Sequence, residues 1–313
     1  NFPALNITGN LEVEVSSRDE GPGSCSNTCN YALKQDGDLE IAGTTTISVN
    51  TSGNHVKIDN ATNDFGTLAV TGAKHIYVAD ENALVLGTTQ GRWMTIAAGG
   101  NVAQADGTTL TFDLHVSVDA EGYNVTLANS GNNVATVKNM KAVDFSFTDT
   151  GGVALGINTV TGNFTITAGS AVSNNGALDI GGITTITAIG QTVELNEATN
   201  NFVGEVRITG GVVTIVDEDT LVLGASTVSG TYTVTAGGPI TDGGALAITG
   251  AATINAGSNA VTLNDGNTFT GDLTLTSAAL ILGATTVGGA LSVTASGAVT
   301  DTGKLGITGI TTI

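Results

Sequence analysis

Leu178–Ile186 has the sequence LDIGGITTI, and the chain repeats variants of this stretch along its length. Related copies are LEIAGTTTI at Leu39–Ile47, LAITGAATI at Leu246–Ile254 and LGITGITTI at Leu305–Ile313, with a degraded copy, LTFDLHVSV, at Leu110–Val118. The spacing between the first residues of successive copies is nearly constant and shortens before the last copy. Such a period indicates stacked supersecondary units, each of which buries its apolar face against its neighbours.

Apolar residues alternate with polar ones inside these repeats, as at Leu178 and Ile180 or Val213 and Ile215. Period two in short runs, interrupted by Gly, Asn and Asp, indicates strands of about four to six residues. A second block, Asn and Phe followed by such a strand, recurs as NDFGTLAVTG at Asn63, NFVGEVRITG at Asn201 and NTFTGDLTLT at Asn267. We expect its Phe to fill the core at a corner.

A repeat of this length holds about eight or nine such strands, and coiling them three to a turn gives three turns of about 20–23 residues. The sequence therefore predicts an all-β fold, a right-handed parallel β-helix (solenoid) with about three rungs per 59–71-residue repeat. Gly and Asn are expected at the corners because they tolerate the left-handed backbone conformation.

The domain prediction is a single β-helical domain over residues 1–313. Its repeat units are 39–109, 110–177, 178–245 and 246–304, with partial units at 1–38 and 305–313. Residues 16–30 are expected to form an inserted loop that contains both cysteines, Cys25 and Cys29. A C-x3-C pair suits a small disulfide in an oxidising compartment. Two free thiols, or half of a metal site, are the alternatives.

The charge balance limits the partners of this chain. Lys and Arg number 9 against 28 Asp and Glu, for a net charge of −19. Such a chain repels phosphate backbones and anionic headgroups, so no nucleic-acid partner is expected. The sequence has no run of about 18 apolar residues, so no membrane insertion is expected either.

Catalysis and metal binding find little support in the sequence. Polysaccharide-degrading β-helix enzymes need converging carboxylates, whereas the acidic turns at Asp80–Glu81 and Asp217–Asp219 are expected to lie about six rungs, or about 30 Å, apart. We therefore expect no enzyme, no catalytic residue and no bound cofactor. The weak candidate for a metal site is a calcium ion at Asp217, Glu218 and Asp219, in a turn otherwise expected to be solvated.

Two further patterns are possible sites. His55, His75 and His115 are spaced at nearly whole rungs. Alternation points them outward, and at about 10 Å apart they would be too distant to share one ion. Thr-x-Thr pairs such as Thr165/Thr167 and Thr233/Thr235 suggest an ordered hydroxyl array of the ice-binding type. The aligned copies recur about three rungs apart, however, so no continuous array is expected.

The succession NDF…LAVTGA…LVLG…LxVTAxG.VTDxGxLxITGxTTI resembles the repetitive β-helix exoproteins of bacteria that are similar to filamentous haemagglutinin, which are two-partner-secreted or autotransported adhesins. The resemblance covers nearly the whole chain outside the insertion around Cys25–Cys29. It implies a β-helix and a secreted or bacterial cell-surface location. Members bind cells, host or matrix glycans, or one another.

These patterns predict a non-enzymatic extracellular structural protein, a rigid rod that assembles into a surface or biofilm-matrix filament. The chain starts and stops almost in phase with its repeat, so we expect it either to continue in a longer chain or to stack head to tail on itself. The interface candidates are Asn1, Phe2, Leu305, Ile307, Ile310 and Ile313. The alternatives are an adhesin stalk whose binding domain lies elsewhere and, less favoured, a polysaccharide-degrading enzyme.

Overall fold

The computed structural model describes residues 2–15, 31–50 and 54–313. All regular elements in these residues are strands, and they form a parallel β-solenoid of about 14 turns. The strands belong to two compact units, Asn1–Gly151 (unit 1) and Gly152–Ile313 (unit 2). The described residues contain no helix that is long and apolar enough to cross a membrane.

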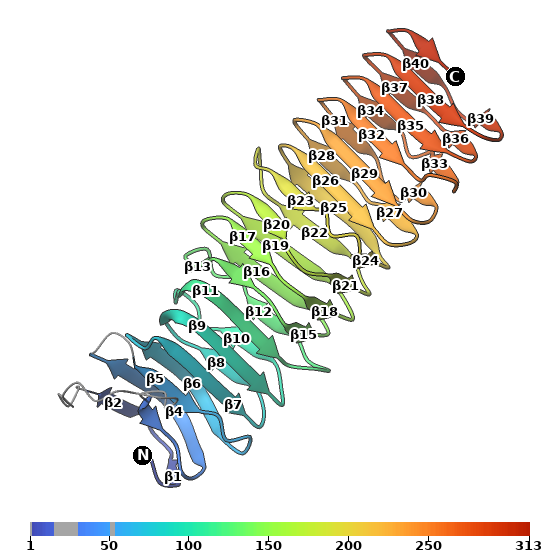
Figure 1. Ribbon diagram of the computed structural model, residues 1–313. Helices are drawn as coiled ribbons and strands as arrows, with labels where there is room; N and C mark the ends of the chain where they lie inside the picture. The colour runs from blue at the N-terminus through green and yellow to red at the C-terminus, as the bar shows by residue number, and fades with distance from the viewer. Residues whose placement is uncertain (1, 16–30, 51–53) are drawn as a thin grey trace, which may run out of the picture. The chain divides into compact units, whose positions relative to one another are not determined.

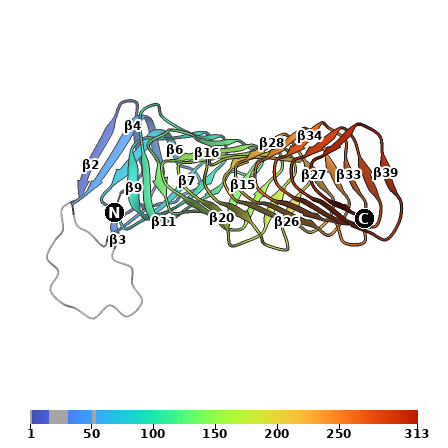
Figure 2. The same ribbon diagram turned by 90° about the horizontal axis from the view of Figure 1, so that it is seen from above.

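Each unit has two parallel sheets, which we call sheet I and sheet II (Figure 1). In unit 1, sheet I contains β1 (Leu5–Ile7), β2 (Leu11–Val15), β4 (Leu39–Val49), β6 (Asp64–Thr71), β8 (Leu84–Leu86), β10 (Val102–Gln104), β12 (Val125–Leu127) and β16 (Phe145–Asp149). Sheet II contains β3 (Tyr31–Lys34), β5 (His55–Ile58), β7 (His75–Asp80), β9 (Thr89–Ala98), β11 (Leu110–Asp119), β13 (Asn133–Val134), β14 (Thr136–Val137) and β15 (Met140–Ala142). Figure 2 shows β4 and β6 on one side of this unit and β9 and β11 on the other.

Unit 2 is built in the same way. Its sheet I contains β19 (Phe164–Ala168), β22 (Thr184–Thr187), β25 (Glu205–Gly210), β27 (Leu221–Leu223), β28 (Ser226–Val228), β30 (Ile240–Asp242), β31 (Leu246–Ile248), β33 (Val261–Leu263), β34 (Asn267–Phe269), β36 (Leu280–Leu282), β37 (Thr285–Val287), β39 (Val299–Asp301) and β40 (Leu305–Ile307). Its sheet II contains β17 (Val153–Leu155), β18 (Asn158–Val160), β20 (Val172–Asn174), β21 (Leu178–Ile180), β23 (Val193–Leu195), β24 (Asn201–Phe202), β26 (Val213–Asp217), β29 (Tyr232–Ala236), β32 (Ala252–Asn255), β35 (Leu273–Ser277), β38 (Leu291–Ala295) and β41 (Thr311–Thr312).

The strand register sets the length of a turn. Val213 pairs with Tyr232, Tyr232 with Ala252, and Ala252 with Leu273, so each turn takes up about 20 residues. One such turn comprises β29 in sheet II followed by β30 and β31 in sheet I. Three strands per turn and three turns per repeat confirm the predicted parallel β-helix.

Stacked side chains fill the interior of both units. The Phe residues of the Asn-Phe blocks, Phe65, Phe202 and Phe269, are fully buried, as predicted. Tyr232 is fully buried as well, and its register partner on the next turn is the small Ala252. Because an inward side chain stacks on its neighbour one strand spacing away, a large residue here is matched by a small one.

The motif LDIGGITTI forms β21, a corner at Gly181 and Gly182, and β22. The expected reason for glycine is wrong at this corner, because neither residue adopts a left-handed backbone. A Cβ atom on Gly181 would instead lie 2.3 Å from the carbonyl oxygen of Thr161 on the preceding turn. Close stacking of successive corners, rather than backbone conformation, therefore requires glycine there.

The first residue of this motif is held by a buried asparagine one turn further along. The backbone N–H of Leu178 donates to Asn200 Oδ1 at 3.1 Å, and Asn200 Nδ2 donates to the carbonyl of Val216. Equivalent bonds join Leu39 to Asn63, Leu110 to Asn132 and Leu246 to Asn267. In these four copies of the motif, one asparagine thus satisfies a buried amide at the start of the copy.

The Cys-containing insertion falls in the first turn of unit 1. Leu5 pairs with Leu39, so this turn is almost twice as long as the one that joins Leu84 to its partner Val102. The predicted loop at 16–30, with Cys25 and Cys29, lies outside the described residues. The single-domain prediction for residues 1–313 stays a prediction.

Replacing Asn200 by alanine should destabilise the fold by about 2–4 kcal/mol, because it leaves the buried Leu178 amide and Val216 carbonyl without this partner. Asn201→Ala is the matched control, since Asn201 bonds only to the exposed Asp179 carboxylate, and we expect it to cost less than about 0.5 kcal/mol. Urea unfolding followed by circular dichroism measures both. Equal losses in the two variants would contradict the role given to Asn200.

Candidate functional site

The acidic turn singled out as a calcium candidate does not bring its three carboxylates together. Asp217 is 2 % exposed and accepts the backbone N–H of Phe202 at 2.9 Å, whereas Glu218 and Asp219 are exposed. Burial raises the pKa of Asp217 to about 6, against the lowering effect of the Phe202 amide. The described residues contain no group of three or more His, Cys, Asp or Glu side chains that could hold a metal ion.

Asp80 and Asp149 occupy the same structural position as Asp217 in earlier repeats. Asp80 accepts the N–H of Phe65 at 2.8 Å and Asp149 accepts that of Val134 at 2.7 Å. Both side chains are buried, and burial raises their pKa values. The interpretation of the Asp217–Asp219 turn as solvated is therefore wrong for Asp217, which caps the Phe202 amide as Asp80 caps that of Phe65.

The candidates for a head-to-tail interface lie at the first and last described turns. Phe2 forms a parallel bridge to Gln35, and Asn1 lies outside the described residues. Leu305 and Ile307 are half-buried, while Ile310 and Ile313 are both 77 % exposed. The equivalents of Leu305 and Ile307 in an earlier repeat, Leu246 and Ile248, are only 1 % exposed.

The histidines lie closer together than their spacing suggested. In sheet II of unit 1, Tyr31, His55, His75, Trp93 and His115 follow one another in register across β3, β5, β7, β9 and β11, and we call them the ring column. Successive ring centroids are 5.9, 4.2, 4.4 and 5.3 Å apart. The expected separation of about 10 Å is wrong for His55 and His75, because their strands are one turn apart rather than two.

The outward placement predicted for all three histidines is also wrong for one of them. His55 is only 7 % exposed, between Tyr31 and His75, and its Nδ1 has no hydrogen-bond partner among the described residues. His75, Trp93 and His115 are half-buried. His75, Trp93 and His115 stack face to face, whereas Tyr31 with His55 and His55 with His75 meet edge to face.

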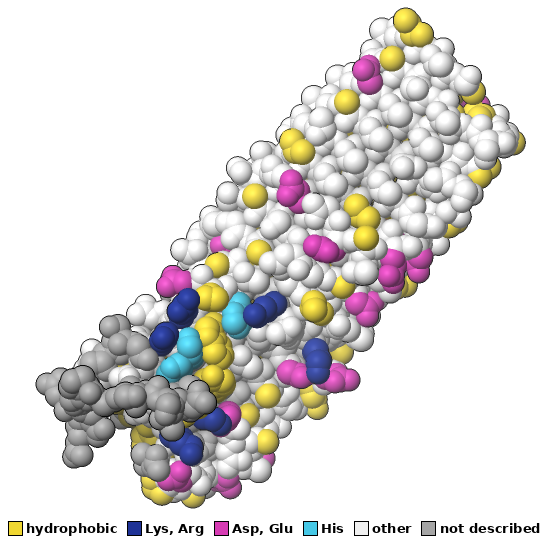
Figure 3. Space-filling model, in the orientation of Figure 1, with side chains coloured by type: hydrophobic (Ala, Val, Ile, Leu, Met, Phe, Trp, Pro, Cys, Tyr) yellow, Lys and Arg dark blue, Asp and Glu magenta, His cyan; other side chains and the backbone are white. Residues whose placement is uncertain are grey.

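Basic side chains gather beside the ring column (Figure 3). Seven of the nine Lys and Arg residues belong to unit 1. Lys74 and Arg92 directly precede His75 and Trp93, and Lys138 lies close enough to lower the pKa of His115. We call Lys74, Arg92 and Lys138 the cation row. None of the three has an ion-pair partner among the residues that the structure describes.

This environment disfavours the charged form of the imidazoles. Burial, followed by the charges of His55, Lys74 and Arg92, lowers the pKa of His75 to about 4. Burial and Lys138 lower the pKa of His115 to about 4 as well. At neutral pH the cation row therefore carries the positive charge while the histidines stay neutral.

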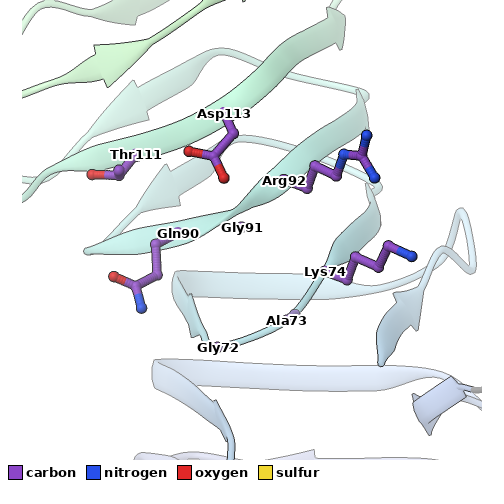
Figure 4. Close-up of a pocket in the computed structure, with 8 residues that line it drawn as sticks. All are labelled: Gly72, Ala73, Lys74, Gln90, Gly91, Arg92, Thr111 and Asp113. Atoms are coloured by element: carbon purple, nitrogen blue, oxygen red, sulfur yellow. The ribbon is translucent and has the colours of Figure 1, made fainter. Parts of the chain in front are cut away.

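A groove of about 420 Å³ opens beside the ring column (Figure 4). Its lining residues are Gly72, Ala73, Lys74, Gln90, Gly91, Arg92, Thr111 and Asp113. A Cβ atom on Gly91 would lie 2.7 Å from the carbonyl oxygen of Ala73, so the floor of the groove is bare backbone. Cations, an amide, a hydroxyl and one carboxylate thus surround a shallow floor without side chains.

Sheet II of unit 2 has a row of hydroxyl side chains. Thr214, Thr233, Thr253, Thr274, Ser292 and Thr312 are register partners on consecutive turns. The Thr-x-Thr pairs Thr233/Thr235 and Thr274/Thr276 lie two turns apart rather than three, and Asn255 interrupts them, so they form no continuous array of pairs. Strands with different sequences, such as ATIN and LTLT, occupy the same place on successive turns. A search for similar sequence motifs does not reveal that pairing.

The fold and its repeating interior bonds define a β-solenoid repeat protein. The chain belongs to the family described as Repeats of unknown function (DUF5649), whose model matches residues 1–72, 73–141, 142–209, 210–276 and 270–313. No curated protein and no solved structure matches the chain. The family match identifies the repeats. It does not show a relationship to filamentous haemagglutinin-like exoproteins.

Sequence reasoning identified the histidines but missed the cation row and the groove. The signal was present, because Lys74-His75 and Arg92-Trp93 are cation–ring pairs that lie one turn apart. It was overlooked because those strands, β7 and β9, belong to the least regular repeats of the chain. Their pairing becomes visible only with the register of sheet II.

Acidification should destabilise unit 1 through His75 and His115. Both have a pKa of about 4 in the folded chain against 6.5 as the ordinary value, so between these values the unfolded state binds more protons. The free energy of unfolding should therefore fall as pH decreases from 6.5 to 4. Urea titrations followed by the fluorescence of Trp93, the single tryptophan, measure it. A His75→Phe/His115→Phe double variant should show a flatter profile, and an unchanged profile would contradict the assignment.

Asp217 should act in the opposite direction. Its pKa of about 6 lies above the ordinary 3.8, so the folded state binds the proton more tightly and the stability falls as pH rises through this range. Asp217→Asn keeps an acceptor for the Phe202 amide and removes the charge, so at pH 7 it should stabilise the fold by about 1–3 kcal/mol. Asp217→Ala leaves that amide unpaired and should destabilise it by about 1–3 kcal/mol. Urea unfolding at pH 7 compares the two variants, and a loss with Asn as large as with Ala would refute this account.

Proposed function

We propose that this protein is a non-enzymatic structural protein of the bacterial cell surface or extracellular matrix, whose β-solenoid is a rigid rod. The observation that carries the proposal is the interior. The asparagine–leucine bond recurs at Asn63, Asn132, Asn200 and Asn267, so four successive repeats use the same interior bond. Most residues of such a chain serve to stack one turn on the next.

The secreted or surface location rests on the resemblance to filamentous haemagglutinin-like exoproteins. An uncharged, hydroxyl-rich surface such as the threonine row of unit 2 is in keeping with it. The absence of an enzymatic role is supported by Asp80, Asp149 and Asp217, since each of these buried carboxylates is used to cap a backbone amide.

The rod is proposed to stack on further turns of the same kind, in a longer chain or in a second copy. The candidates for this contact remain Leu305, Ile307, Ile310 and Ile313. Uncovered parallel strands present unpaired amides and carbonyls, to which another turn can be added. Head-to-tail addition is heterologous and non-closing, and therefore produces filaments.

The second candidate is the stalk of an adhesin, in which this region displays a binding domain located elsewhere. A polysaccharide-degrading enzyme is the least favoured candidate. Turnover of an acidic polysaccharide that is lost with Asp217→Ala and kept with Asp217→Asn would still reflect folding, whereas turnover lost with both would favour an enzyme.

Assembly through the last turn is tested with two exposed isoleucines. Ile313 is 77 % exposed, whereas Ile254, at the same place in an earlier copy of the motif, is fully buried; Ile189 is 74 % exposed at a corner inside unit 2. If copies stack end to end, Ile313→Asp should abolish filaments, because it places a charge in the new interface, whereas Ile189→Asp should assemble like the unchanged protein. Negative-stain electron microscopy and sedimentation over a range of concentrations measure this. Discrete particles of the unchanged protein at every concentration would exclude self-assembly.

A further inference from the structure

We propose that the cation row and the adjoining groove of unit 1 bind an acidic polysaccharide, with its carboxylates on Lys74, Arg92 and Lys138 and its sugar rings over the groove floor. This binding role is separate from the structural role of the repeats. It also does not depend on the last turn of unit 2, so either can fail without the other.

The first argument is charge. Among the described basic side chains outside the row, Lys57 pairs with Asp59, Lys141 with Asp119 and Arg207 with Glu205, whereas Lys34 and Lys304 have no ion-pair partner among the described residues. The cation row is left unpaired in a chain with a net charge of −19. Cations held together without a carboxylate partner attract an external anion, and a cleft focuses that attraction.

The second argument is spacing. Arg92 N donates to the carbonyl of Lys74 at 2.8 Å, so the two residues lie on directly adjacent strands. Adjacent strands are about 4.8 Å apart, so Lys74 and Arg92 lie one turn apart. Lys138 follows β14, two turns beyond Arg92, because β11 lies between them and has no Lys or Arg. A polymer that crosses the strands can meet all three, whereas a single small anion meets one or two. In a polysaccharide with one carboxylate per sugar, the distance between charges is of the same order as the spacing between strands.

The third argument is the chemistry of the groove. Gly72, Ala73 and Gly91 leave backbone as its floor, so a flat ring can approach closely. Gln90 and Thr111 supply an amide and a hydroxyl for sugar hydroxyl groups. Its volume of about 420 Å³ lies within the range of small-ligand sites.

Nucleic acid fits this surface less well. Single-stranded binding proteins stack bases on aromatic faces, but His75 and Trp93 lie face to face at 4.4 Å, and Trp93 and His115 at 5.3 Å. Asp113 also projects into the groove, where it can accept a hydrogen bond from a sugar hydroxyl group (Figure 4).

Binding is measured by titrating the full chain with polygalacturonate at low salt and following the fluorescence of Trp93, which adjoins Arg92. We expect a saturable change that weakens with added salt. A Lys74→Gln/Arg92→Gln variant should bind at least about tenfold more weakly. The matched control is Arg207→Gln/Lys304→Gln, which removes the same two charges outside unit 1 and should stay within about twofold. Circular dichroism and the urea midpoint show that each variant is folded.

The remaining ligands decide the chemical class. Dextran, which is neutral, and galacturonate monomer should bind far more weakly than the polymer. Equal loss in the two double variants, no binding of polygalacturonate, or tighter binding of single-stranded DNA or inorganic phosphate than of polygalacturonate would each overturn the proposal.

Discussion

Within each unit, every turn lies directly on its neighbours at the strand spacing of about 4.8 Å, and most other features follow from this constraint. At the corner of LDIGGITTI the spacing leaves no room for a Cβ atom, because Gly181 lies against the carbonyl of Thr161. In the interior, the same spacing places the small side chain of Ala252 against the large one of Tyr232. On the surface it turns one outward residue per turn into a row, which is hydroxyl-bearing in unit 2 and aromatic in unit 1.

The same constraint explains the buried polar residues. A parallel strand that starts at a corner has a first amide that the neighbouring strand does not always satisfy, and leaving it unpaired in the interior is costly. Asn200 solves this for Leu178, and Asp217 solves it for Phe202. Asparagine is neutral and offers both a donor and an acceptor. The aspartate offers only acceptors when ionised, and burial accordingly raises its pKa to about 6.

The sequence predicted the fold because the fold depends on repetition. The alternation at Leu178 and Ile180 and the Phe of the Asn-Phe blocks each report on one local environment, and the structure confirms them. The polar interior was only partly predictable. Alternation continues from Val213 and Ile215 to Asp217 and so places it inward, but it does not show which amide the buried carboxylate caps, because Phe202 lies on another strand. The ring column required the register of β5, β7 and β9, and that register depends on turns of unequal length. Three strands with different sequences, HVKI, HIYV and WMTI, stack there in register.

At the cation row, the stacking of turns works against stability. Like charges on neighbouring strands repel by about 0.2–1 kcal/mol, and opposite charges gain as much. The chain uses the favourable arrangement elsewhere, since Asp119 and Lys141 are register partners joined at 2.8 Å. Lys74 and Arg92 instead stack cation on cation, and the neutral state of His75 only limits the repulsion. Nothing among the described residues offsets this cost. An anion lying across the strands would offset it, and it would remove repulsion at the same time as it adds attraction.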